Sequence, residues 1–124
     1  MTLNPGPAPD DVGGDPYETP LRVTVGLRGR WVTIEVGGDI DMTTGPLLEE
    51  RIGTALESSP WVVLEAAEVT FCDSSGLNVL IRAWRKAVEA GGRLVLLRPS
   101  GHLRRVLEIT GLDERLDITD MAPE

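Results

Sequence analysis

Several residue types are scarce in this chain, and each scarcity excludes a class of protein. The single cysteine, Cys72, leaves no intramolecular disulfide to form, which is typical of proteins from the reducing cytosol. The single histidine, His102, and one cysteine cannot supply a clustered zinc site, so we expect no metal and no cofactor. No apolar run approaches the roughly 20 residues of a membrane-spanning helix, and the amino terminus lacks the features of a signal peptide. We therefore expect a cytoplasmic protein with no membrane partner.

Basic residues are also few. The chain has 12 lysine and arginine residues against 20 aspartate and glutamate residues, which gives a formal net charge of −8. A phosphate backbone would repel such a chain unless one face were strongly basic. Basic residues gather only in doublets such as Arg104-Arg105. We therefore expect no nucleic-acid partner.

Motifs that mark common enzyme classes are missing from the chain. It has no GxSxG nucleophile elbow, no GxxxxGK[ST] phosphate loop and no GxGxxG turn before a helix. A hydrolase triad would need Ser75, His102 and a carboxylate to converge with no supporting motif. The chain is therefore predicted not to be an enzyme and to have no catalytic residues.

Residues 1–20 differ in composition from the rest of the chain. They contain five prolines, three glycines and four acidic residues, but no basic residue. Such a segment buries too little apolar area to offset its chain entropy, so we predict a disordered acidic tail. Residues 21–120 are predicted to form one domain, which is long enough to bury a core without disulfides. Residues 121–124 are predicted to form a short carboxy-terminal tail.

Hydrophobic periodicity predicts that strands and helices alternate within this domain. Strand-like apolar patterns lie at 21–27, 31–36, 61–64 and 93–97, and a last short element lies at 112–118. The first two strands form a hairpin, and helical periodicity begins after Thr44, Asp73 and Ser100, all good capping residues. Two β-α-β crossovers require parallel strands. The predicted fold class is therefore α/β, a mixed β-sheet with an N-terminal hairpin, central parallel strands and helices packed on the sheet.

Two short acidic segments follow predicted strands. Asp39 and Asp41 lie in a predicted turn at 37–41, and residues 66–70 are predicted to link the third strand to Asp73-Ser74-Ser75-Gly76. Both segments have a plain structural interpretation, because Asp and Ser side chains cap helices and stabilise turns. Two aspartates alone form a weak cation site, since hard cations prefer more oxygen ligands.

The second segment also suits a phosphorylation switch. A serine hydroxyl at a helix start lies near unpaired backbone N–H groups and the positive end of the helix dipole, which stabilise a phosphate. Asp73 acts in the opposite direction through like-charge repulsion. A phosphoserine would add about −1.5 to −2 charges to a surface that a partner must approach. The residues by themselves leave capping and switching both open.

Three motifs, in order, resemble those of STAS domains. Gly38-Asp39-Ile40-Asp41 resembles their Gly-[Glu/Asp]-hydrophobic-Asp element, and the segment 71–80 resembles their Asp-Ser-Ser/Thr-Gly-Leu-Gly-Val-Leu element. The segment 103–112 and the apolar residues after it are similar to the family's closing helix and strand. The resemblance covers 21–120 and is strongest to the bacterial anti-sigma factor antagonists. Asn78 departs from the pattern, because the family has glycine there.

The resemblance implies a phosphorylation-gated binding protein. In that family the second serine or threonine of the element, here Ser75, is phosphorylated by a GHKL-type serine kinase that is also the anti-sigma factor. The unphosphorylated antagonist sequesters this kinase and frees a sigma factor, and a serine phosphatase resets the switch. The surroundings of the phosphosite and the partner-binding residues are then Asp39, Asp41, Asp73, Ser74, Gly76, Leu77 and Asn78.

The sequence leaves three questions open. The alternative function is a non-regulatory STAS module, either an accessory subunit of a lipid transporter or a scaffold, in which Ser75 only caps its helix. Leu77 belongs either to the core or to the apolar part of a partner surface. The oligomeric state is left undetermined.

Overall fold

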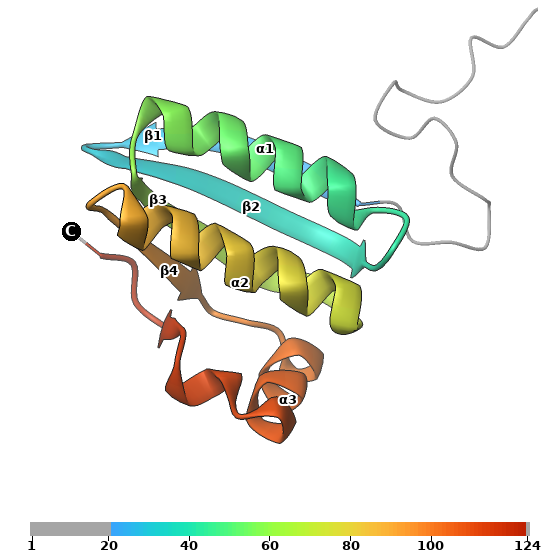
Figure 1. Cartoon of the computed structure of the whole chain (residues 1–124). Helices are drawn as coiled ribbons and strands as arrows, with labels where there is room; N and C mark the ends of the chain where they lie inside the picture. The colour runs from blue at the N-terminus through green and yellow to red at the C-terminus, as the bar shows by residue number, and fades with distance from the viewer. Residues whose placement is uncertain (1–20, 124) are drawn as a thin grey trace, which may run out of the picture.

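Five strands and three helices follow one another along residues 21–123, the part of the chain that the computed structural model describes (Figure 1). The strands are β1 (Arg22–Arg28), β2 (Trp31–Ile40), β3 (Trp61–Cys72), β4 (Arg93–Leu97) and β5 (Asp117–Thr119). The helices are α1 (Gly45–Ser58), α2 (Ser74–Glu89) and α3 (Gly101–Thr110), with a 3-10 turn at Leu112–Glu114. The tail predicted for residues 1–20 lies outside the described residues, so the domain limits at 20 and 120 stay a prediction.

The strands form one mixed sheet in the order β1-β2-β3-β4-β5. β1 pairs antiparallel with β2 as the predicted hairpin, and the other three pairings are parallel. Since α1 and α2 each follow a parallel strand, both helices begin at the same edge of the sheet and run side by side (Figure 1). The predicted α/β fold class, with its hairpin and central parallel strands, is confirmed.

The main hydrophobic core lies between one face of the sheet and the helices. Its largest members are almost fully buried and come from every layer: Ile34, Leu64 and Leu96 from the sheet, and Leu48, Leu80, Leu103 and Leu107 from the helices. Burying each such side chain contributes about 1.5–3 kcal/mol to stability. Most periodic apolar positions identified in the sequence therefore face inward, but Val25, Leu27 and Val88, which follow the same patterns, are 48%, 78% and 51% exposed.

A second, smaller cluster occupies the opposite face of the sheet. It consists of Trp31, Val63, Val95 and Leu97, with Trp61 and Ala122 packed against it. The Trp31 and Trp61 rings meet edge to face with centroids 5.3 Å apart. The guanidinium of Arg30 lies 3.7 Å from the centre of a Trp61 ring, within cation–π distance.

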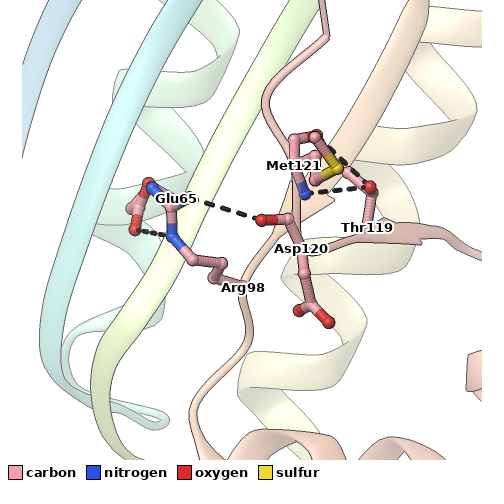
Figure 2. A network of polar contacts seen from close by, with 5 residues as sticks. All are labelled: Glu65, Arg98, Thr119, Asp120 and Met121. Carbon is pink, nitrogen blue, oxygen red and sulfur yellow. Dashed lines mark hydrogen bonds and ion pairs between the residues drawn. The ribbon is translucent and has the colours of Figure 1, made fainter.

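Arg98 fastens the end of the chain to this opposite face. Its guanidinium donates two hydrogen bonds to the Glu65 carboxylate, at 2.8 and 3.1 Å, and a longer one to the carbonyl of Asp120 (Figure 2). The hydroxyl of Thr119 also exchanges hydrogen bonds with the backbone of Met121. The segment after β5 is therefore anchored to β3 at a distance from the two acidic segments.

Two strands are longer than their sequence predicts. The expected end of the second strand at Val36 and the expected link at 66–70 are both wrong, because β2 continues to Ile40 and β3 to Cys72. Backbone pairing between the two strands outweighs the weak strand propensity of Gly37 and Gly38. Register shifts occur near both glycines, and Gly38 has a φ of 97°, which favours glycine.

Candidate functional site

The ends of β2 and β3 bring the two acidic segments together. Ile40 is paired with Cys72, and the backbone N–H of Asp73 donates to the carbonyl of Ile40 at 3.2 Å. Just beyond these strand ends, Asp41 and Ser75 line one surface hollow of about 260 Å³. The two segments therefore lie at one end of the sheet, as the parallel arrangement of these strands requires.

Aspartate side chains organise the backbone on both sides of this junction. The carboxylate of Asp73 accepts a hydrogen bond from the N–H of Gly76 at 3.0 Å and so caps α2. The carboxylate of Asp41 accepts from the N–H groups of Thr43 and Thr44, at 2.9 and 3.0 Å. Thr44 itself does not cap α1, contrary to expectation. Its hydroxyl instead donates to the Asp39 carbonyl at 2.7 Å and accepts from the N–H of Asp41 at 2.9 Å, so it stabilises the turn between β2 and α1.

Ser75 is the second residue of α2 and is partly exposed. Within residues 21–123 its hydroxyl makes no hydrogen bond, whereas the capping bond of the helix belongs to Asp73. Ser74, the first residue of α2, is more exposed. The interpretation of Ser75 as merely a helix cap is therefore wrong, because another side chain already holds that position.

Gly76 allows the start of α2 to lie against β2. A Cβ atom built at this position would lie 2.7 Å from the Ile40 carbonyl oxygen, 2.7 Å from the Cys72 sulfur and 2.8 Å from an Ile40 methyl carbon. Such distances are well inside van der Waals contact, and the backbone carbonyl cannot rotate away as a flexible side chain can. Glycine is therefore required here by lack of space.

The remaining predicted site residues fall in three different environments. The carboxylate of Asp39 accepts a hydrogen bond from the Thr70 hydroxyl, which joins β2 to β3, and neither residue lines the hollow. Leu77 is 7% exposed and belongs to the main core, which answers the question that its sequence context left open. Asn78 is exposed and lines the hollow with Ser75.

An ion pair between the two helices was missed in the sequence. The Arg82 guanidinium donates two hydrogen bonds to the Glu49 carboxylate, at 2.7 and 2.9 Å, and both residues line the hollow. The hydrogen bond from Arg82 lowers the pKa of Glu49, and the same bond raises the pKa of Arg82. Arg82 stands seven positions after Ser75, which places both on one helical face. That spacing could have placed Arg82 on the face of Ser75, but the sequence holds no signal for its pairing with Glu49 on another helix.

Apolar side chains are exposed around the same end of the sheet. Met42, which lines the hollow, is 77% exposed, and Phe71 at the end of β3 is 43% exposed. The ring of His102 at the start of α3 lies 5.5 Å from the ring of Phe71, centre to centre. His102 is exposed as its sequence predicts, and this aromatic contact is an additional finding.

Cys72 is a buried core residue, as its position in the sequence predicts. Burial, followed by the negative charge of Asp73, raises the pKa of its thiol to about 12. The thiol therefore stays protonated at neutral pH and is a poor nucleophile. In the described part of the chain, no three His, Cys, Asp or Glu side chains gather to hold a metal ion. No helix between residues 21 and 123 is long and apolar enough to cross a membrane.

Comparison with known proteins gives consistent matches over this region. A family model described as "Mlab, STAS domain" matches residues 23–120. The anti-sigma-B factor antagonist of Bacillus subtilis (strain 168) is 30% identical over 99 residues, covering 80% of this chain and 91% of that protein. The anti-sigma-B factor antagonist of Listeria monocytogenes is 32% identical over 94 residues, covering 75% and 82%. The matched segment 23–120 contains both acidic segments of the site.

A solved structure shares the fold as well. The crystal structure of an anti-sigma factor antagonist from Mycobacterium paratuberculosis matches with a TM-score of 0.73 and 28% sequence identity. The match covers 82% of this chain and 86% of that one. The similarity therefore extends over most of both proteins.

Substitution of Gly76 tests the close approach of α2 to β2. We expect Gly76→Ala to lower the free energy of unfolding by about 1–3 kcal/mol, because the added methyl group overpacks the junction. Gly53→Ala is the matched control, since Gly53 lies in α1 with no neighbour near its Cβ position. That change should stabilise the protein by about 0.4–1 kcal/mol. Urea denaturation measures both, and equal stabilities of the two variants would contradict the steric argument.

A second pair of substitutions compares the contributions of the Asp73 cap and the Ser75 hydroxyl to stability. Asp73→Ala removes the acceptor for the Gly76 N–H, so we expect a loss of about 1 kcal/mol in unfolding free energy. Ser75→Ala removes a hydroxyl that makes no bond within the described residues, and its effect should stay within about 0.5 kcal/mol. Asp73→Asn keeps a capping oxygen and serves as the control. If Ser75→Ala cost as much as Asp73→Ala, the capping role would have to be reassigned.

Proposed function

The chain belongs to the STAS domain family, and from that premise we propose that it is a phosphorylation-gated anti-sigma factor antagonist. In this proposal the unphosphorylated form sequesters a GHKL-type anti-sigma factor serine kinase in the cytoplasm and so frees a sigma factor. Phosphorylation releases the kinase, and a serine phosphatase restores the binding form. The curated relatives are named for antagonism of a regulatory factor and not for a reaction. The chain is accordingly a regulatory binding protein rather than an enzyme.

The proposal rests on the exposure and the hydrogen bonding of the Ser75 hydroxyl. It is partly exposed at the start of α2 and makes no hydrogen bond to any described residue. Asp73 supplies the cap, so modification of Ser75 does not remove an interaction that the helix needs. The hydroxyl also borders a hollow into which a partner side chain can reach.

The chemistry of the switch is a phosphoryl transfer. The kinase transfers the γ-phosphoryl group of ATP to the Oγ of Ser75. One P–O bond of ATP breaks, a new O–P bond forms, and ADP and the hydroxyl proton leave. The product carries about −1.5 to −2 charges at neutral pH. These charges arise beside Asp73 and next to the hollow that Asp41 lines, so a partner that fits the neutral hydroxyl meets repulsion and a desolvation cost.

The accessory-module alternative receives less support. In that alternative Ser75 is only a structural residue, yet the capping bond of α2 comes from Asp73. Both curated relatives described above, at 30% and 32% identity, carry the name anti-sigma-B factor antagonist. We therefore propose the antagonist function. The experiments below include a result that would favour the accessory role instead.

Phosphosite mapping tests the acceptor. Purified GHKL-type serine kinases of the source bacterium, incubated with the chain and Mg-ATP, should add one phosphate, which mass spectrometry should locate on Ser75. Ser75→Ala should abolish incorporation, and Ser74→Ala should leave it intact. Phosphate on Ser74 alone would overturn the assignment. A kinase that binds the chain but never phosphorylates it would favour the accessory or scaffold role.

Binding measurements test the effect of charge. We expect Ser75→Asp to weaken binding to that kinase by about 3–5 kcal/mol, because an unpaired charge is then buried in the interface. This corresponds to roughly a hundredfold or more in Kd. Ser75→Ala should bind nearly as well as the unmodified chain, and Ser74→Asp places the same charge one residue earlier as the control. Equal affinities of Ser75→Asp and Ser75→Ala, measured by calorimetry on folded samples, would rule out gating by charge.

A further inference from the structure

A polar stripe runs along α2 from the proposed acceptor. Ser75, Asn78 and Arg82 are spaced at i, i+3 and i+7, so they lie on one face of the helix. All three line the hollow, and Asp41 and Glu49 line it from the α1 side. Of the described residues around the hollow, Arg82 is the one cation. A phosphate on Ser75 would therefore have a single positively charged side chain within this hollow.

Arg82 is already engaged, but its partner can be exchanged. It makes two hydrogen bonds to Glu49, and the side chains of Arg82 and Glu49 are 48% and 33% exposed. Exposed ion pairs rearrange readily because water competes with both partners. A phosphoserine dianion offers three strong acceptor oxygens and more charge than a carboxylate, and guanidinium groups bind phosphate in a bidentate manner. The phosphate is therefore the stronger competitor for the guanidinium.

The geometry of α2 brings the two ends of the stripe within reach of each other. Seven residues of α-helix span about 10 Å along the axis. Long helical side chains lean toward the amino terminus, which carries the guanidinium of Arg82 back along α2 toward Ser75. Glu49, its present partner, lies in the second turn of α1, and α1 begins at the same edge of the sheet as α2. The guanidinium is thus already drawn toward the end of the helices where Ser75 lies.

We propose that Arg82 holds the phosphate of phosphorylated Ser75, and that it exchanges the Glu49 carboxylate for this phosphate. Arg82 is a positioning residue in this scheme, since it acts through the modified serine. The released Glu49 then loses both hydrogen bonds from Arg82, so the rearrangement extends from Ser75 to the neighbouring helix α1. The inference deepens the proposed function, because it concerns the phosphorylated state of Ser75.

Other charges near the pair do not replace Arg82 in this role. Asp41 and Asp73 are carboxylates and repel a phosphate. Lys86, one helical turn after Arg82, lies near Glu49 and, after Arg82, also lowers the pKa of that carboxyl, but it lines a different groove. Once Arg82 leaves, Lys86 remains as a neighbour for Glu49 without reaching the hollow.

Phosphorus NMR can test the exchange without any kinase. Phosphoserine is installed at position 75 of the full chain by genetic code expansion, and the 31P shift is titrated to obtain the second phosphate pKa, which is near 6 in free phosphoserine. We expect an Arg82-bound phosphate to titrate about 0.5–1 unit lower, since a nearby cation favours the dianion. Arg82→Gln should abolish this depression. Glu49→Gln should deepen it, because it removes the competing carboxylate.

A control variant and a rescue variant distinguish direct contact between Arg82 and the phosphate from a general effect of positive charge on α2. Arg85→Gln removes the same positive charge from α2, but Arg85 lies beside Trp84 and Leu112 and away from the hollow, so the phosphate pKa should stay unchanged. Arg82→Lys should restore part of the depression. The inference is overturned if Arg82→Gln and Arg85→Gln titrate alike, or if Glu49→Gln raises the pKa. The proposed function has a separate test. It fails if no kinase modifies Ser75, even if Arg82 lowers the pKa of the installed phosphate.

Discussion

The contact between the first turn of α2 and the end of β2 is the constraint on which the site depends. The absence of a side chain at Gly76 allows the α2 backbone to approach the Ile40 carbonyl, to which Asp73 also donates a backbone hydrogen bond. A methyl group there would collide with backbone that is already paired in the sheet. Because this junction is tight, the turn after β2 and the turn before α2 form one surface. Asp41 and Ser75 thereby become neighbours across a shared hollow.

The amino termini of two helices offset the negative charge of the aspartates at this surface. The amino termini of α1 and α2 both lie at the edge of the sheet that carries Asp41 and Asp73. The positive ends of two helix dipoles and their free N–H groups therefore offset the aspartates. Asp73 takes the capping position, and the Ser75 hydroxyl makes no hydrogen bond to the described residues. In the proposed phosphorylated state the phosphate is close to these acids, and Arg82 is the cation among the described residues that line the same hollow.

Much of the fold could be predicted because local patterns determined it. The alternating apolar residues of β2 and the 3.6-residue period of Leu77, Leu80 and Trp84 correspond to faces that pack on the core. In β1 the alternation is only partly borne out, because Val25 and Leu27 are 48% and 78% exposed. The lengths of β2 and β3 could not be predicted in this way. Their last residues include glycines and acids with weak strand propensity, and they are extended because each strand supplies the backbone partners of the other. Such pairing joins residues about thirty positions apart, and a local window does not contain it.

The sequence by itself determined the α/β class, the order of the elements, and Asp39, Asp41, Asp73 and Ser75 as the residues of interest. Only the tertiary structure decided which contacts each of these residues makes. Asp39 binds Thr70, Asp73 caps α2, and Leu77 enters the core. It also decided that Glu49 of α1 meets Arg82 of α2 beside Ser75. The physical reason is that periodicity specifies which face of a helix is apolar. Which polar groups meet between two helices depends on their relative placement against the sheet, which only the folded core specifies.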